Sequence, residues 1–382
     1  MATTKVIKDL TDLNKANSES GLKMPSSNAA YSGPTVAEGM MRNQVGQVSE
    51  SSASTMQHYN GTDWKNFVNK AAISTFNISY LLVGGGGGGG FNIGAGGGAG
   101  QYLVSHLTEA SGGSTAASPS TGEMTTGVAY SITIGTGGAG GPDTQDSTGL
   151  NGTSTVLNFE GRGGGGAITE TAIGGGGGGT GSVPYRDGLN GASGGGGSRG
   201  SNATGAGQGA QAFGVTTGYK GGNSFFTAPG NYDSSAGGGG AFGAASNATG
   251  KGGYNGGIGF VSAIDGTSTG RGGGGGGGGF SGALSLKGLG TQGGGNGGTD
   301  AATQAVKGAD NTGGGGGGGS GSGSPDSVRE GGTGGSGVVI IRYPSAQAPT
   351  LSGGATGDID QAISGSTDKY AKVTGSGTIT FS

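Results

Sequence analysis

The chain has 382 residues, of which 105 are glycine, and its formal net charge at pH 7 is −3. Glycine normally makes up about 7% of a sequence, so this composition excludes a large hydrophobic core. The slightly acidic balance excludes the basic surface of a nucleic-acid-binding protein. Cysteine is absent, which excludes disulfides, thiolate metal sites and thiol nucleophiles. Only 11% of residues are charged, whereas disordered chains combine low hydrophobicity with high charge.

Residues 1–72 differ in composition from the glycine-rich centre and are expected to form a separate N-terminal segment. Val6, Leu10 and Leu13 follow helical spacing, so a short helix or an extended arm is expected there. The first residues lack the apolar stretch of a signal peptide. No run in the chain is long and apolar enough for a membrane span, so we expect neither a leader nor membrane insertion.

Two stretches near the end of this segment predict a pair of strands around a Ser-rich loop, Glu38–Asn43 and Thr55–Phe67. Asn60-Gly61 predicts a hairpin turn, since both residue types tolerate positive φ. Trp64 is expected to pack on that hairpin. The sequences EGMMRN and QHYNGTDWKNF resemble the "EGMIRYN…FYNGTDWK" hairpin of bacteriophage tail-fibre and virion-appendage proteins. In that family such segments lie near the virion-proximal end of fibres, which implies attachment to other fibre or tail proteins.

Uninterrupted glycine runs recur between residues 84 and 319. A flexible linker is one interpretation, because glycine loses more backbone entropy on folding than any other residue. An ordered layer is favoured because the longer runs are similar in length, are widely distributed and adjoin β-branched segments. The runs are Gly84–Gly90, Gly163–Gly166, Gly174–Gly179, Gly194–Gly197, Gly237–Gly240, Gly272–Gly279 and Gly313–Gly319.

Polyproline-II-like polyglycine is the conformation that suits such a layer. It has three residues per turn, a rise of about 3.1 Å and no internal hydrogen bonds, so seven residues span roughly 22 Å. Each N–H and C=O group points outward and must find a partner on a neighbouring segment. We therefore predict a bundle of glycine rods held by backbone hydrogen bonds, each worth about 1 kcal/mol net.

Strand-forming segments flank the runs at 73–83, 130–134, 153–159 and 338–343. The first and last of them are expected to pair and to close one domain over residues 73–345. The predicted fold class is mainly β plus polyglycine II: a small β-sheet or sandwich frames a bundle of glycine-rich PPII-like helices, with almost no α-helix.

The flanks of this domain, ISYLLVGGGGGGG and GGSGVVIIRYP, resemble those of glycine-rich domains in phage fibres. They are also similar to the glycine-rich region of anaplastic-lymphoma-kinase-type receptors, where strands frame a polyglycine II bundle. Residues 346–382 are expected to be a short C-terminal β segment, with strands near 362–364, 370–373 and 378–381. An end cap, a trimerisation element and a binding tip are all compatible with that segment.

No motif in the sequence predicts catalysis. GxGxxG carries no information in a chain this rich in glycine, and Gly250-Lys251 lacks the Ser or Thr of a P-loop. His58 and His106 lie in different segments, and the aspartates are scattered. Glu160 and Glu170 are compatible with a carboxylate pair for glycan cleavage, although such side chains more often form solvated turns. We predict no enzyme, no cofactor and no metal.

The loops between the runs carry nearly all aromatic residues of the centre. Loops held by a rigid scaffold often carry recognition, and aromatic rings are frequent at binding hot spots. The alternative is that these rings cover the faces and edges of the glycine layer. The candidate receptor-contacting residues are Tyr102, His106, Tyr185, Phe213, Tyr219, Phe225, Phe226, Tyr232, Phe242, Tyr254, Phe260 and Phe280.

Together with these candidates, the resemblance implies a phage fibre or fibre-tip adhesin on the virion surface that recognises a host receptor without catalysis. The receptor would be a host-surface glycan or an outer-membrane protein. The chain would be a homotrimer or a cap on a trimeric fibre, with no nucleic-acid partner. The first alternative is a purely structural virion protein, such as a capsid fibre, collar or tail component. The second is a matrix-like glycine-rich protein of cellular origin.

Overall fold

The chain divides into two units, Met1–Ile73 and Ser74–Ser382. Within the described residues there is no α-helix, and hence none that could cross a membrane. The computed structural model describes residues 41–45, 54–59, 62, 64–66, 74–113, 121–142, 147–163, 165–181, 184, 186–199, 208–212, 217–225, 234–279, 286–299, 303–321 and 329–382.

The described part of the N-terminal unit is a three-stranded antiparallel sheet in the order β1-β2-β3. Strand β1 is Met41–Val45, β2 is Ser54–Tyr59 and β3 is Trp64–Asn66. The β1–β2 pairing confirms the two predicted strands on either side of the Ser-rich stretch. The predicted helix around Leu10 and the Asn60-Gly61 turn lie outside the described residues.

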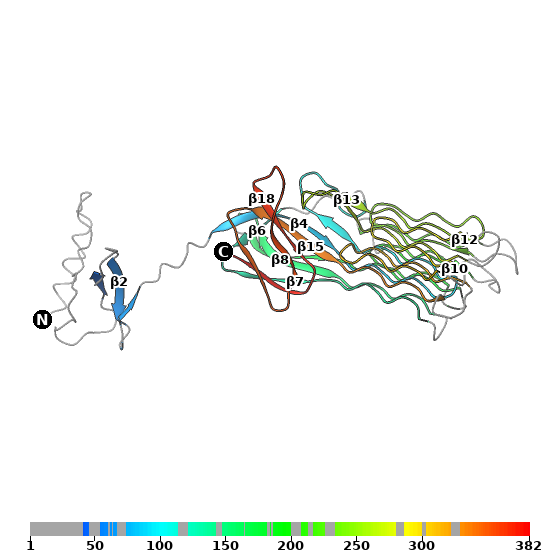
Figure 1. Cartoon of the computed structure of the whole chain (residues 1–382), viewed down its shortest axis with the longest axis horizontal. Helices are drawn as coiled ribbons and strands as arrows, with labels where there is room; N and C mark the ends of the chain where they lie inside the picture. The colour runs from blue at the N-terminus through cyan, green and yellow to red at the C-terminus, as the bar shows by residue number, and fades with distance from the viewer. Residues whose placement is uncertain are drawn as a thin grey trace. The chain divides into compact units, whose positions relative to one another are not determined.

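The second unit is built on an 11-stranded sheet. Its main path runs β16-β19-β7-β8-β6-β4-β15-β18-β17, while β5 pairs with β4 and β9 with β8. The end strands β16 and β17 lie against each other, so the sheet is nearly closed and barrel-like (Figure 1). The strands are β4 Thr75–Val83, β5 Tyr102–Val104, β6 Gly122–Thr125, β7 Ala129–Thr133, β8 Thr155–Gly161, β9 Gly165–Ala172, β15 Val338–Pro344, β16 Pro349–Ser352, β17 Gly357–Ala362, β18 Asp368–Val373 and β19 Gly377–Phe381.

The first and last strands of the predicted domain are direct neighbours. Strand β4 pairs antiparallel with β15, with Val83 opposite Val338 and Tyr80 opposite Ile341. This confirms the expectation that the segment before the first glycine run pairs with the segment after the last one. Strand β4 alternates exposed and buried residues at its start and is fully buried over its last four residues, because a hydrophobic cluster covers each of its faces there.

Side chains from both faces of β4 and β15 enter two hydrophobic clusters. The larger cluster fills the inside of the sheet with Tyr80, Leu157, Phe159, Ile341, Phe381 and their neighbours. Rings meet there at close range, for example Phe76 and Phe381 with centroids 5.1 Å apart. The smaller cluster includes Leu81, Val83, Tyr102, Phe260 and Val338.

The C-terminal residues are part of this sheet rather than a separate segment, which corrects the predicted division at residue 346. Strand β18 pairs with β15 and β19 pairs with β7. Ile379 and Phe381 are fully buried in the larger cluster. The reason is that β15 and β7 offer edges to be paired, and alternate residues of β19 point into the core. The strand expected at 362–364 lies earlier, as β17.

Short strands occur outside the large sheet. Strands β10 (Ser198–Arg199), β11 (Ser234–Ser235) and β12 (Gly252–Gly253) form a three-stranded sheet among the glycine segments. Strands β13 (Phe260–Ser262) and β14 (Thr269–Arg271) form a hairpin near the large sheet (Figure 1).

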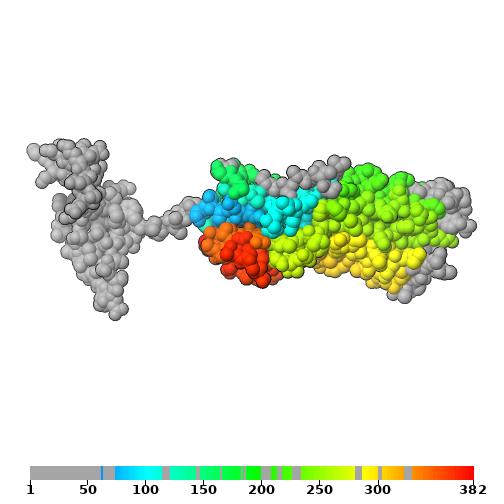
Figure 2. Space-filling model, turned by 90° about the horizontal axis from the view of Figure 1, so that it is seen from above, coloured from blue at the N-terminus to red at the C-terminus, as the bar shows by residue number. Residues whose placement is uncertain are grey.

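Long glycine-rich segments leave the sheet side by side and return to it (Figure 1). We call them the glycine bundle: the described residues within 84–101, 135–153, 173–259 and 272–337. In Figure 2, β4 and the C-terminal strands cover the sheet end of this unit, and the green and yellow segments cover the bundle. The far end of the bundle is the end away from the sheet.

The run Gly84–Gly90 shows how the bundle is held together. Its N–H groups donate to three partner segments in rotation, so that every third residue meets the same partner. Gly84, Gly87 and Gly90 donate to the carbonyls of Gln101, Gly98 and Ala95 at 2.8–2.9 Å. Gly85 and Gly88 donate to the carbonyls of Thr153 and Leu150 at 2.9 Å. Gly86 and Gly89 donate to the carbonyls of Gly335 and Gly332 at 2.9 Å.

The carbonyl groups of the same run accept from three further segments. The N–H groups of Gly175 and Gly178 donate to Gly85 and Gly88, those of Gly138 and Gly141 to Gly86 and Gly89, and those of Gly316 and Gly319 to Gly87 and Gly90. The run is therefore surrounded by six other described segments. All seven of its N–H groups and the carbonyls of Gly85–Gly90 are bonded to other segments.

This packing leaves no room for side chains in the middle of a run. A Cβ added at Gly87 would lie within 3.0 Å of the carbonyl of Gly176, and one added at Gly276 would meet the carbonyl of Gly288 equally closely. Contacts that close are essentially never made by real Cβ atoms. The glycine runs are thus required by how closely their neighbours approach.

Candidate functional site

The turn Phe91–Ile93 joins the first run to its returning segment at the far end of the bundle. Asn92 and Ile93 have φ values of 49° and 53°, a left-handed conformation that is uncommon for non-glycine residues. The carbonyl of Phe91 accepts a hydrogen bond from the Thr180 hydroxyl at 2.8 Å, and the Arg329 guanidinium lies 5.0 Å from the Phe91 ring centroid. Contacts from these two segments hold this turn in one conformation.

Asparagine side chains complete the hydrogen bonding along the bundle surface. Asn151 Oδ1 accepts from the N–H of Gly177 at 2.9 Å, and Asn223 Oδ1 accepts from Gly209 at 2.8 Å. Asn255 does the same for Leu289 and Asn296 for Gly290. In each case a side-chain carbonyl takes the place of a neighbouring backbone carbonyl, so these asparagines have a structural role.

Three of the candidate receptor-contacting residues lie inside the protein. Tyr102 and Phe260 are 1% and 9% exposed, and their rings stack with centroids 5.0 Å apart. His106 is also buried; burial is the main cause that lowers its pKa, and nearby Arg342 lowers it further. These three side chains form internal packing, because β5 and the β13–β14 hairpin close over the smaller cluster.

Four candidates remain at least partly accessible. Phe242 is 42% exposed and meets the edge of Phe260, with centroids 4.9 Å apart. Tyr219, Phe225 and Tyr254 are of intermediate exposure on different bundle segments. The described candidates are therefore not gathered into one aromatic patch. The other candidates lie outside the described residues: Tyr185, Phe213, Phe226, Tyr232 and Phe280.

Exposed aliphatic residues, which the sequence interpretation did not single out, lie on adjacent bundle segments. Leu286 and Leu289 are 59% and 50% exposed, and their carbonyls accept hydrogen bonds from Gly253 and Gly256 on the next segment. That segment also carries Ile258, which is 45% exposed. The spacing of three between Leu286 and Leu289, within a glycine-poor stretch, was the signal that could have revealed them.

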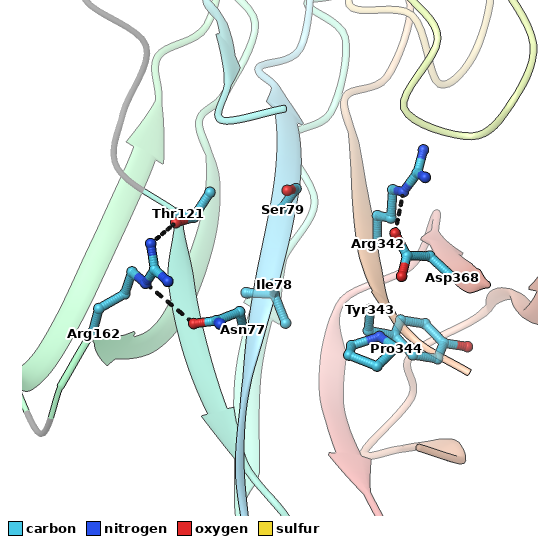
Figure 3. Close-up of a pocket in the computed structure, with 9 residues that line it drawn as sticks. All are labelled: Asn77, Ile78, Ser79, Thr121, Arg162, Arg342, Tyr343, Pro344 and Asp368. Atoms are coloured by element: carbon cyan, nitrogen blue, oxygen red, sulfur yellow. Dashed lines mark hydrogen bonds and ion pairs between the residues drawn. The ribbon is translucent and has the colours of Figure 1, made fainter. Parts of the chain in front are cut away.

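A polar pocket of about 310 Å³ opens on the large sheet. Figure 3 shows Arg162 on one side, Arg342 and Asp368 on the other, and Asn77, Ile78 and Ser79 of β4 between them. Thr121, Tyr343 and Pro344 complete the lining. The pocket thus brings together residues from β4, β15, β18 and the segments before β6 and after β8.

Each arginine of the pocket is fixed by hydrogen bonds. Arg162 donates through Nε to Asn77 Oδ1 at 3.1 Å and through Nη1 to Thr121 Oγ1 at 3.3 Å. Arg342 donates through Nε to Asp368 Oδ2 at 2.9 Å and through Nη2 to Ser366 Oγ at 2.8 Å. No pattern in the sequence indicates this pocket, because its residues are far apart in the chain and lie on or beside ordinary strands.

The carboxylates considered for glycan cleavage do not face each other. Across the β8–β9 pair, Glu160 is opposite Ala167 and Glu170 is opposite Leu157. Glu160 Oε2 accepts a hydrogen bond from the Thr125 hydroxyl at 2.7 Å. No group of three or more potential metal-ligating side chains occurs among the described residues.

Residues 67–344 match the family model described as a glycine-rich domain. This match covers most of the chain, and the protein belongs to that family. No curated protein and no solved structure matches the chain.

Proposed function

We propose that the glycine bundle consists of polyglycine II helices. The support is the rotation of hydrogen-bond partners along Gly84–Gly90, in which every third residue meets the same neighbour. A helix with three residues per turn and outward-pointing backbone groups has this property. Gly272–Gly279 follows the same rule: Gly273, Gly276 and Gly279 donate to Gln292, Gly295 and Gly298.

On this scaffold we propose that the protein is a phage fibre or fibre-tip adhesin that binds a host-surface receptor without catalysis. The observation that carries the proposal is that successive bundle segments run out from the sheet and back. Connections such as Phe91–Ile93 therefore lie at the far end, on a support in which each run bonds to several neighbours (Figure 1). The N-terminal unit, which resembles a fibre-attachment hairpin, supplies the link to other virion proteins.

Rigidity of the support favours binding by exposed residues of such connections; at Phe91–Ile93 both apolar side chains are buried and Asn92 is partly exposed. A surface that is already ordered loses less conformational entropy when a receptor binds. Several copies on one virion add avidity without any new contact. Exposed Leu286, Leu289 and Phe242 provide apolar contact area on the bundle side, suited to an outer-membrane protein or to the apolar face of a glycan.

The test uses the purified full chain and bacteria that are susceptible to the virus that carries it. We expect the chain to bind these cells and to reduce plaque formation when it is added before infection. The adhesin proposal would be contradicted if the chain neither bound the cells nor competed with infection and a labelled antibody located it on the virion head.

The structural alternative also has support in one observation. Tyr102, Phe260 and His106 are buried, so part of the aromatic complement serves packing rather than recognition. A collar, capsid fibre or tail component needs only such packing. Substitution of exposed Leu286 and Leu289 by Ser separates the two proposals, because an adhesin should lose cell binding while a structural protein should leave infection unchanged.

A further inference from the structure

We propose that the pocket between Arg162 and Arg342 binds an acidic saccharide, meaning a sugar ring that carries a carboxylate or a phosphate group (Figure 3). The pocket lies on the sheet and shares no residue with the bundle surface considered above. The proposal therefore goes beyond adhesion and does not depend on it.

The first argument is charge. Arg162 is exposed, and its two hydrogen-bond acceptors, Asn77 Oδ1 and Thr121 Oγ1, are both neutral. Glu123 lies nearby, but its Oε2 accepts from the backbone N–H of Gly163 at 3.1 Å. The Arg162 guanidinium is thus positioned at the pocket wall by neutral groups, and an anionic ligand can bind it through charge-assisted hydrogen bonds.

The opposite wall adds a second guanidinium. Arg342 is paired with a single carboxylate, Asp368, and the side chain of Asp368 is 37% exposed against 18% for Arg342. The lining residues contain two cationic side chains and one anionic one, and Glu123 beside Arg162 adds a second carboxylate. The pocket therefore attracts an anion through the donors of its two guanidinium groups rather than through a net positive charge.

The second argument is the mixture of polar and apolar groups. Ser79 contributes a hydroxyl and Asn77 an amide, while Pro344 contributes apolar atoms. Ile78 also lines the pocket, but its side chain is buried in the larger cluster. Sugars present hydroxyl groups around the ring and C–H groups on its faces, so such a mixture suits them better than it suits a bare inorganic ion. The cavity volume of about 310 Å³ lies at the lower end of the range for small-molecule pockets, which limits the ligand to one or two sugar units.

The third argument is preorganisation. Ser79 and Arg342 are register partners on the paired strands β4 and β15, and Asp368 lies on β18, which also pairs with β15. The Arg342 wall and the β4 residues are therefore fixed by central strands of the sheet, and Arg162, in the segment after β8, is held by its two hydrogen bonds. A ligand would meet side chains already held in place, so little ordering cost opposes binding.

The test measures binding of four probes to the full chain by saturation-transfer NMR: glucuronate, glucose 6-phosphate, glucose and inorganic phosphate. We expect at least one anionic sugar to bind about tenfold more tightly than glucose and than inorganic phosphate. We also expect its affinity to fall with added salt, because screening weakens ion pairing. The two anionic sugars distinguish a carboxylate ligand from a phosphate ligand.

Arg162→Gln is the decisive variant, because this exposed side chain can be shortened without disturbing the core, which an unchanged melting temperature would verify. We expect it to weaken anionic-sugar binding about tenfold. Lys307→Gln is the matched control, since Lys307 pairs with Asp310 on the bundle, and it should leave binding unchanged. Equal binding of glucose, equal binding of inorganic phosphate, no effect of Arg162→Gln, or no binding of either anionic sugar would each overturn the proposal. Cell binding by Arg162→Gln, measured in parallel, tests the adhesin function separately.

Discussion

The large sheet and the glycine bundle are held together by opposite means within one unit. The sheet is stabilised by side chains, since Tyr80, Leu157 and Phe381 are fully buried in its core. The bundle is stabilised by main chain, since each run places its N–H and C=O groups against neighbouring runs. A missing side chain is therefore damaging in the sheet, whereas an added one is damaging in the bundle.

This contrast explains how a chain so poor in hydrophobic residues orders so many segments. A bundle of glycine has little apolar surface to bury, and the large entropy of glycine in the unfolded chain opposes its ordering. Hydrogen bonds and close backbone packing must offset that cost together. Removing one segment would leave the donors and acceptors of several neighbours unpaired, so we expect the bundle to unfold as a single cooperative unit.

The largest expected effect comes from adding a methyl group inside the bundle. Gly276→Ala places a Cβ within 3.0 Å of the Gly288 carbonyl group, so the two segments must separate. We expect a loss of about 3 kcal/mol or more in the free energy of unfolding, measured by chemical denaturation. Gly166→Ala is the matched control, because a Cβ there meets nothing within 4 Å. Equal stability of the two variants would contradict the bundle's packing.

The sheet should respond to the reverse change. Leu157 is fully buried in the larger cluster, whereas Leu150, on a bundle segment, is 58% exposed. We expect Leu157→Ala to cost about 2–5 kcal/mol, because it leaves a cavity, and Leu150→Ala to cost about 0.5 kcal/mol or less. Thermal unfolding of both variants checks this difference. A large effect at Leu150 would mean that side chains support the bundle as they support the sheet.

A smaller effect is expected at the surface asparagines of the bundle. Asn151 accepts from the N–H of Gly177 and donates through Nδ2 to the carbonyl of Asn190, both at 2.9 Å. Asn151→Ala removes both bonds and should cost about 1–3 kcal/mol, because Gly177 is buried and its N–H would lose its acceptor. Asn151→Asp retains the acceptor for Gly177 and should cost less. Hydrogen exchange at Gly177 would report the loss directly.

The smallest effect concerns alkaline pH and belongs to the sheet. Burial is the main cause that raises the pKa of Tyr343 and of Tyr80 above their ordinary value, and for Tyr80 the charge of Glu170 adds to it. Because the folded-state pKa values are raised, this stability is complete below the unfolded value of about 10 and is lost as the pH rises above it. We expect the melting temperature to fall between pH 9 and pH 11. The melting temperature of the Tyr343→Phe variant should fall less steeply over that range. An identical slope would show that Tyr343 does not contribute to this pH dependence.

The candidate pocket shows the limit of reading this chain without its fold. Arg162 and Arg342 are separated by 180 positions in the sequence and come together only because β4 lies between β6 and β15. The same limit applies to the aromatic residues. Tyr102 and Phe260 were expected at a contact surface because they lie between glycine runs, but the β13–β14 hairpin places their rings against each other inside the smaller cluster.

By itself the sequence determined the glycine-rich segments, the strands that flank them and the pairing of the first strand with the last. The physical reason is local: contiguous glycine leaves only backbone groups to bond, and the β-branched residues of β4 and β15 favour strands. Only the tertiary structure decided that residues 346–382 complete the sheet, which rings are buried and where two arginines line one pocket. Those outcomes depend on which strand edges remain to be paired, and that information is spread over the whole chain.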